Sequence, residues 1–298
     1  MERSVPPKLP EAAQDLVLHA PSNGPAMRPH HVEAITHLCD VTMSAGTSTS
    51  HVARLPLPTM DELLKARIAT ACTAERIDFA IVARNQRLQD FGLVAMDMDS
   101  TLITIECIDE IADMQGIKPQ VAAITEAAMR GEIDFPESLR RRVSLLAGLD
   151  QSALQRVYDE RLRLSPGADA MLAKLKELGI RTLLVSGGFT FFTDRLKARL
   201  GLDTTLSNTL EIVGGKLTGR VQGDIVDAKA KAAKLAATRD ALGLKKEQVI
   251  ALGDGANDLA MMAEAGVSIA FHAKPVVREK ATHAFNYAGL DGLMAIYR

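Results

Sequence analysis

Three groups of polar residues, each placed directly after a short apolar run, hold side chains that could do chemistry. The groups are Asp97-Met98-Asp99-Ser100-Thr101, Ser186-Gly187-Gly188 and Gly253-Asp254-Gly255-Ala256-Asn257-Asp258. Carboxylates one residue apart can converge on one hard cation such as Mg²⁺, which prefers oxygen ligands. A serine followed by glycines lets backbone N–H groups approach an anion closely. The pattern indicates a site that holds an anion beside a hard divalent cation.

Each group also has a purely structural interpretation. A helix cap would explain one of the two acids Asp97 and Asp99, but not the one that directly follows a buried strand. Ser-Gly-Gly is also an ordinary strand-to-helix turn, and Gly-Asp-Gly is good turn chemistry. Three such groups at the ends of successive apolar runs favour a catalytic site over three unrelated turns.

Lys231 is a weaker candidate, because it lies in the lysine-rich helical stretch DAKAKAAKLAATRDALG. A single lysine on such a helix is usually solvated surface. Nothing in the local sequence separates Lys231 from Lys229 or Lys234, so the local pattern leaves the choice among them open.

The elements that must position these groups alternate between apolar strands and helices. The predicted strands are 91–96, 180–185, 248–253 and 267–271. They are short, rich in Val, Ile and Leu, and apolar nearly throughout, which is typical of strands buried on both faces of a parallel sheet. Ligands of such sheets bind outside the carboxyl ends of the strands. The fold class is therefore α/β with a Rossmann-like parallel sheet.

Two insertions accompany this sheet. Residues from about 106 to 165 read as three helices, and a connection of that length is not a simple crossover, so we expect a helical cap over the active edge of the sheet. The segment TLEIVGGKLTGRV reads as a β-hairpin flap that turns at Gly214-Gly215.

The first part of the chain differs in character. Residues 1–88 follow the order strand, helix, strand, helix, strand, which predicts a small α+β unit, and they contain no catalytic cluster. We therefore expect two domains, residues 1–88 and residues 89–298.

Composition limits the kinds of partner. The chain has 298 residues, 47% of them hydrophobic and 24% charged, with a formal net charge of −2. We expect no nucleic-acid or membrane partner, because such partners usually require a basic surface or a long apolar segment. The three scattered cysteines, Cys39, Cys72 and Cys107, are typical of reduced thiols in a cytoplasmic protein.

The order of the polar groups resembles that of the haloacid dehalogenase superfamily of phosphohydrolases. Longer segments narrow the resemblance to the phosphoserine phosphatase family: DMDSTLITIECIDEIA, ESLRRRVSLLAGL, VSGGF, GKLTG, GDGANDLAMM and AFHAKP. The resemblance covers residues 91–298. Residues 1–88 resemble only faintly the ACT-like regulatory unit of some members, which implies a possible homodimer through that unit.

The resemblance implies hydrolysis of O-phospho-L-serine, the last step of serine biosynthesis, through an aspartyl-phosphate. Asp97 is then the nucleophile, and Asp99 is the general acid that later acts as base. One Mg²⁺ is held by Asp97, by the backbone oxygen of Asp99 and by Asp254. We expect metal contact to keep Asp97 ionised and a neighbouring negative charge to raise the pKa of Asp99.

The resemblance also implies phosphate-binding residues. It assigns Lys231, Ser186 and the Gly187 N–H to the phosphate. Asn257 contacts the phosphate or steadies Lys231, and Asp258 orients its neighbours.

Substrate readers follow from the same resemblance. It assigns Glu106 to the ammonium and Arg142 to the carboxylate of the substrate. Without it, the run Arg140-Arg141-Arg142 also fits a solvated helix face. Met129 and Phe135 line the cap side of the pocket, or else pack in the core.

Two other functions remain open from the sequence. The same scaffold could carry a phosphatase for another small monoester, such as phosphothreonine, or a phosphotransferase acting on an alcohol such as homoserine. A non-catalytic amino-acid sensor, acting through the N-terminal residues, belongs to a different class.

Overall fold

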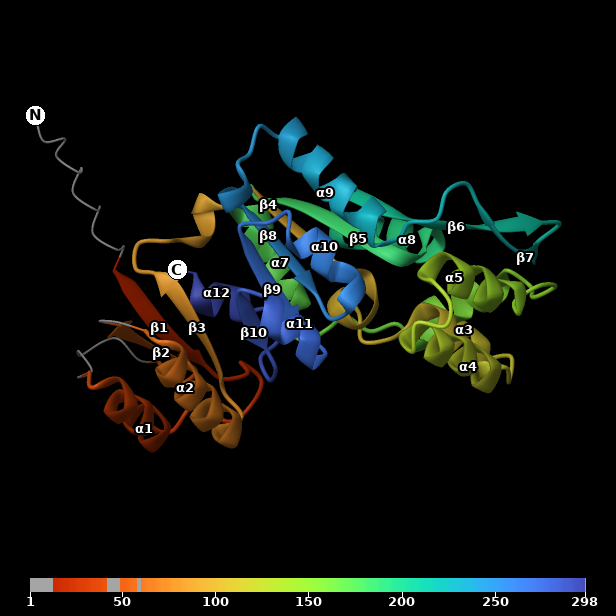
Figure 1. Cartoon of the computed structure of the whole chain (residues 1–298). Helices are drawn as coiled ribbons and strands as arrows, with labels where there is room; N and C mark the ends of the chain where they lie inside the picture. Colours follow the sequence, from red (N-terminus) through yellow and green to blue (C-terminus); the bar gives the residue numbers. More distant parts are fainter. Residues whose placement is uncertain (1–12, 42–48, 58–59, 298) are drawn as a thin grey trace, which may run out of the picture. The chain divides into compact units, whose positions relative to one another are not determined.

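The computed structural model describes residues 13–41, 49–57 and 60–297, and these form two compact units (Figure 1). One unit contains the described residues up to Leu88 together with the residues from Gly292 onward, and the other runs from Gln89 to Asp291. The sequence-based division had placed the last residues with the larger unit. No helix among the described residues is long and apolar enough to cross a membrane.

The N-terminal unit is built on a three-stranded antiparallel sheet with the order β2-β1-β3. Its elements are β1 (Gln14–His19), α1 (Pro29–Cys39), β2 (Val52–Leu57), α2 (Glu62–Glu75), β3 (Asp78–Ala83) and the C-terminal α12 (Gly292–Ile296). Leu16, Leu18 and Leu55 of the sheet are buried in one apolar cluster with Ile35 and Ile68 of the two helices. The predicted α+β order is thus confirmed for the described residues.

The larger unit contains a seven-stranded sheet with the order β10-β9-β8-β4-β5-β6-β7. Its strands are β4 (Leu93–Met96), β5 (Arg181–Phe189), β6 (Thr204–Val213), β7 (Lys216–Gln222), β8 (Val249–Gly253), β9 (Val267–Phe271) and β10 (His283–Phe285). All neighbours pair in parallel except β6 and β7. The predicted parallel sheet is confirmed. Sequence reasoning missed β10, which is only three residues long, and the parallel part of β6, which is rich in polar residues.

Complete burial of the central strands explains their uniform apolar sequence. Every residue of β4, β8 and β9 is buried. The helices α7 (Ala168–Glu177), α8 (Thr190–Leu200) and α9 (Ala228–Ala241) pack on β5. Two further short helices, α10 (Leu259–Met262) and α11 (Pro275–Lys280), follow β8 and β9. A strand covered on both faces has no polar side to show in its sequence.

The predicted helical cap is present. It consists of α3 (Cys107–Asp113), α4 (Lys118–Met129), α5 (Phe135–Ser144) and α6 (Ser152–Arg156), followed by a π-helical turn over Val157–Arg161. Two short segments connect it to the sheet and pair with each other, since Thr104 N–H donates to the carbonyl of Arg163 (3.0 Å) and Ser165 N–H to that of Leu102 (3.0 Å). The cap is therefore joined to the sheet by a paired, two-stranded connection.

The predicted flap is the antiparallel hairpin of β6 and β7. Gly214 and Gly215 form its turn, both with positive φ (58° and 78°), which glycine adopts without strain. The hairpin is also hydrogen-bonded to the cap. Leu217 exchanges backbone hydrogen bonds with Gly148 and Leu149, both of 2.8 Å. The flap and the end of the cap thus form one hydrogen-bonded assembly.

Candidate active site

The carboxyl ends of three neighbouring strands bring the predicted polar groups together. Asp97 follows β4 and Asp254 follows β8, while Ser186 lies in the last part of β5, and these strands are adjacent in the order β8-β4-β5. Asp97, Asp254 and Asp258 each offer one carboxylate oxygen, and these oxygens lie within 4.8 Å of one another. Residues separated by more than 150 positions therefore form one acidic cluster.

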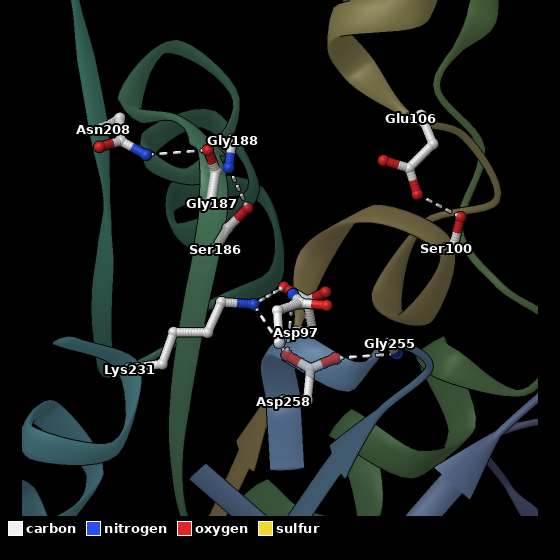
Figure 2. Close-up of polar contacts among 11 residues, drawn as sticks. Asp97, Ser100, Glu106, Ser186, Gly187, Gly188, Asn208, Lys231, Gly255 and Asp258 are labelled. Carbon is white, nitrogen blue, oxygen red and sulfur yellow. Dashed lines mark hydrogen bonds and ion pairs between the residues drawn. The ribbon is translucent and has the colours of Figure 1, made fainter. Parts of the chain in front are cut away.

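Lys231 enters this cluster from α9. Its Nζ donates to Asp97 Oδ1 at 2.7 Å and to Asp258 Oδ1 at 2.8 Å (Figure 2). Its side chain is buried, whereas Lys229 is exposed and Lys234 is only partly buried. Burial disfavours the ammonium, but the two carboxylates outweigh burial and raise the pKa of Lys231 above its usual range. Of these three lysines, Lys231 is the one that the fold brings into the acidic cluster.

Both oxygens of Asp258 already have partners. Oδ1 accepts from Lys231, and Oδ2 accepts from the Gly255 N–H at 3.1 Å. The Asn257 side-chain amide also donates to Asp258 Oδ1, at 3.4 Å. Asp258 therefore fixes the position of Lys231 and of the turn after β8.

The cluster carries more negative than positive charge. Burial and the neighbouring Asp258 raise the pKa of Asp97, which the Lys231 ammonium opposes. Burial, followed by Asp258 and Glu106, raises the pKa of Asp254 to about 6. Three carboxylates facing one ammonium, all with oxygen ligands, are a donor set that fits a hard divalent cation such as Mg²⁺.

Asp99 lies on the turn after Asp97. Asp99 and Ser100 have non-helical backbone angles, and Ser100 has a φ of 55°. Asp99 Oδ1 accepts from the Cys107 N–H at 3.0 Å. Its other oxygen faces the Ser186-Gly187-Gly188 segment, the predicted phosphate-binding segment that we call the phosphate loop, because a Cβ at Gly188 would lie only 2.8 Å from Asp99 Oδ2. Burial and then Glu106 raise the pKa of Asp99 to about 7, so burial contributes more than the negative neighbour that we expected.

The Ser186-Gly187-Gly188 segment is the irregular end of β5 rather than a separate turn, since pairing with β6 shifts register between Val185 and Phe189. The Gly188 N–H donates to the buried Ser186 Oγ at 2.8 Å. A Cβ at Gly187 would lie 2.9 Å from the Phe135 ring, which places this cap residue directly over the segment. A larger residue at position 187 would therefore displace the Phe135 ring, which favours glycine here.

Glu106 and Arg142 lie on the cap near the same site. Ser100 Oγ donates to Glu106 Oε1 at 2.7 Å. Arg142 is partly buried, and burial lowers its pKa against the opposing effects of Asp109, Glu106 and Asp99. The other two arginines of the run, Arg140 and Arg141, are exposed. Arg142 is thus the least exposed of the three, and it interacts with acids of the site.

Met129 does not pack in the core. Its side chain is 63% exposed, and its Sδ lies 3.8 Å from Lys274 Nζ. Lys274 follows β9, and its backbone N–H donates to the carbonyl of Asp254 (3.2 Å). Met129 therefore lies where the end of α4 meets a loop of the sheet's active edge.

Comparisons with known proteins identify the family of this chain. A profile of the haloacid dehalogenase-like hydrolases matches residues 94–263. A phosphoserine phosphatase of Polaromonas sp. is 56% identical over 217 residues, which cover 71% of this chain and 92% of that protein. The chain belongs to the phosphoserine phosphatase family. The predicted resemblance is thus confirmed, and with it the class of phosphoric monoester hydrolases.

Solved structures of this family agree in fold. The unliganded structure of a probable phosphoserine phosphatase from Vibrio cholerae has a TM-score of 0.79 at 39% identity, covering 96% of this chain and 86% of that one. A structure described as a phospho-aspartyl intermediate analogue of phosphoserine phosphatase has a TM-score of 0.65 at 38% identity, covering 70% of this chain and 99% of that one.

Three residues around this phosphatase-family site were missed by sequence reasoning: Ser100, Asn208 and Lys274. Ser100 is part of a predicted group but received no role of its own. Asn208 is fully buried within β6. The sequence predicted this strand only as part of a hairpin, so a polar residue in it did not indicate a role in the site. Lys274 is one residue of the AFHAKP segment, and the sequence pattern indicates no role for it. Lys274 meets Met129 across 145 positions and Asn208 meets Gly187 across 21, whereas Ser100 meets Glu106 only 6 positions away.

Proposed function

We propose that this protein hydrolyses O-phospho-L-serine to L-serine and phosphate, as the last step of serine biosynthesis. The observation that carries this proposal is the buried Asp97 carboxylate, held 2.7 Å from Lys231 at a strand end. A buried carboxylate fixed beside a cation and next to an anion-binding loop is suited to accept a phosphoryl group.

In the first step, an Asp97 carboxylate oxygen attacks phosphorus and the bond from phosphorus to the serine oxygen breaks. Asp99 gives its proton to the departing oxygen, so L-serine leaves and an aspartyl-phosphate remains. A pKa of about 7 suits this role, since Asp99 is protonated in a substantial fraction of molecules near neutral pH. In the second step, Asp99 takes a proton from water, the water oxygen attacks phosphorus, and Asp97 is released with inorganic phosphate.

The residues of the acidic cluster divide their tasks. Asp97 and Asp254, with the backbone oxygen of Asp99, hold one Mg²⁺, which when bound neutralises phosphoryl charge and aligns donor and acceptor. Lys231, Ser186 and the Gly187 N–H bind the phosphoryl oxygens. Asp258 keeps Lys231 in place, and Asn257 supports Asp258.

Substrate choice lies with the cap. Glu106 binds the ammonium of phosphoserine and Arg142 binds its carboxylate with parallel hydrogen bonds. Phe135 covers Gly187 and excludes water from the phosphate loop, and Met129 lies at the edge of the cap. This pair of opposite charges favours a zwitterionic amino-acid ester over a simple monoester.

Release of inorganic phosphate from a panel of esters tests the proposal. The full chain should hydrolyse phosphoserine with a higher kcat/KM than phosphothreonine, phosphoethanolamine or p-nitrophenyl phosphate, and only with Mg²⁺ present. Preference for another ester would show a phosphatase for a different small monoester. Appearance of phosphohomoserine when homoserine is added would show a phosphotransferase. Binding of serine without phosphate release from any ester would instead indicate a sensor. Homodimerisation through the N-terminal unit and a cytoplasmic location stay predictions.

A further inference from the structure

Asn208 is a buried polar side chain without a role in the chemistry described above. It is 1% exposed, and both ends of its amide bond to backbone groups of other segments. Its Nδ2 donates to the carbonyl of Gly187 at 2.8 Å (Figure 2), and its Oδ1 accepts from the Val226 N–H at 2.8 Å. One side chain therefore connects two stretches of backbone that both lead to the active site.

The first stretch is the phosphate loop. The peptide between Gly187 and Gly188 has its carbonyl held by Asn208 and its N–H held by Ser186 Oγ. Two successive glycines have wide backbone freedom, so neither can fix the orientation of this peptide by itself. The two hydrogen bonds hold this peptide from outside, and with it the stretch of backbone that carries the Gly187 N–H.

The second stretch is the start of α9. Val226 directly precedes Asp227, whose side chain caps α9 by accepting from the Ala230 N–H at 2.9 Å. Lys231 follows in the first turn of the helix and reaches Asp97. A shift at Val226 would therefore move the helix start that carries the phosphate-binding lysine.

Asn208 also lies where the flap leaves the sheet. It pairs with Phe189 of β5, and the next residue, Thr209, pairs with Gln222 of β7. The flap beyond this point is hydrogen-bonded to the cap. A side chain at this junction can hold the phosphate loop in a fixed position relative to the flap and the cap.

We propose that Asn208 is a positioning residue for phosphoryl transfer, whose single amide holds the phosphate loop and the start of the Lys231 helix in fixed relation. It acts through Gly187 and Lys231 and does not itself touch the substrate. The inference rests on the proposed function only in placing the transferring phosphate at this loop, whatever alcohol the ester carries.

Two variants test the inference in the full chain with Mg²⁺. Asn208→Asp is nearly isosteric and keeps an acceptor for Val226, but it places a carboxylate oxygen against the Gly187 carbonyl. Asn208→Ala removes both hydrogen bonds. Ser207→Ala is the matched control, because it removes a side-chain hydrogen bond of 2.7 Å to Thr193 from the neighbouring position of the same strand.

We expect Asn208→Asp to lower kcat by about 10²-fold on both phosphoserine and p-nitrophenyl phosphate, because misplacement of catalytic groups by about 1 Å costs that much. Inhibition by inorganic phosphate should weaken in parallel, whereas inhibition by L-serine should change by less than about threefold, because serine is read by the cap. Ser207→Ala should keep kcat within about threefold of the wild-type value on both esters.

A pH signature separates positioning from general damage to the fold. In Asn208→Asp, burial should raise the pKa of the introduced carboxyl, and its protonated form can donate to Gly187 again, so the ratio of variant to wild-type kcat should rise as pH falls from about 8 to about 5.5. A flat ratio, a wild-type kcat in Asn208→Asp, or equal losses in Ser207→Ala would overturn the inference. Should the wild-type chain cleave p-nitrophenyl phosphate but not phosphoserine, the proposed function fails while the p-nitrophenyl phosphate arm still decides the role of Asn208. If Asn208→Ala does not fold, Asn208→Asp carries the test alone.

Discussion

Buried charge is arranged oppositely in the two units of this protein. In the N-terminal unit, the buried Asp15 lies between two arginines, with Oδ1 2.8 Å from Arg84 Nε and Oδ2 3.6 Å from Arg54 Nη1. Arg54 also donates to the carbonyl of Ile296 at 2.9 Å. One carboxylate with two cations leaves no negative charge uncompensated, so this group serves the fold.

In the larger unit, three carboxylates face one lysine, and burial followed by the neighbouring Asp258 raises the pKa values of Asp97 and Asp254. Burying like charges costs free energy unless a cation joins them. The balance of buried charge therefore separates a structural ion pair from a binding site, although both contain buried aspartates.

The largest expected effect comes from neutralising an aspartate in each unit. Asp97→Asn should lower the rate of phosphate release by about 10⁴-fold or more, because the nucleophile is lost. The unfolding midpoint should not fall, since Lys231 keeps Asp258 and one repulsive charge is removed. Asp15→Asn should do the reverse, destabilising its unit by about 3 kcal/mol while kcat stays unchanged. Phosphate-release assays and thermal unfolding measure both, and an active Asp97→Asn would break the comparison.

Removal of divalent metal should produce the next largest effect. EDTA should reduce phosphate release by about 10³-fold or more, because several kcal/mol of charge stabilisation is lost, and added Mg²⁺ should restore it. Mg²⁺ should also raise the unfolding midpoint of the wild-type chain but not that of Asp254→Asn. Equal stabilisation of both proteins by Mg²⁺ would place the ion elsewhere.

Arg142→Ala should lower kcat/KM for phosphoserine at least about 30-fold, since truncating one partner of a buried charge pair costs at least about 2 kcal/mol. The loss for p-nitrophenyl phosphate, which has no carboxylate to bind, should be much smaller. Arg141→Ala is the matched control, because Arg141 pairs with Glu137 on the exposed helix face (2.7 Å). Equal losses on the two esters would show that Arg142 does not read the carboxylate.

Stability of the metal-free protein should fall as pH rises from about 4 to about 7. The folded state holds the protons of Asp254 and Asp99 up to pKa values of about 6 and about 7, whereas the unfolded chain releases them near its ordinary pKa. Between these values the folded state binds more protons, so rising pH favours unfolding, by up to about 3 kcal/mol for Asp254. In EDTA at pH 7, Asp254→Asn should therefore unfold at a higher temperature than the wild-type chain. A lower midpoint would contradict the charge imbalance.

The smallest effect should come from Arg84→Ala in the N-terminal unit. Arg84 is nearly half exposed, and Arg54 remains beside Asp15, so the loss of stability should be at most about 1 kcal/mol. Phosphate release should keep its wild-type kcat/KM. A change in kcat/KM would mean that this ion pair is coupled to catalysis.

Most of the fold could be predicted because it is encoded locally. Strands buried on both faces must be apolar throughout, as in β4, β8 and β9, and the turn at Gly214-Gly215 needs two residues that accept positive φ. The acidic cluster could also be predicted from the sequence. Its acids directly follow predicted strands, and parallel strands bring their carboxyl ends to one edge of the sheet. β10 was missed because three residues carry too little pattern.

Local sequence pattern was enough to predict the parallel sheet, the two insertions and the acidic strand ends. Only the tertiary structure selected Lys231 over Lys229 and Lys234, distinguished Arg142 from its neighbouring arginines, and gave Asn208 its two partners. The physical reason is distance along the chain: Lys231 meets Asp97 across 134 positions. Local sequence pattern predicts the helix or strand in which a residue lies. Which charged side chains are buried and paired depends instead on which distant segments the fold brings together.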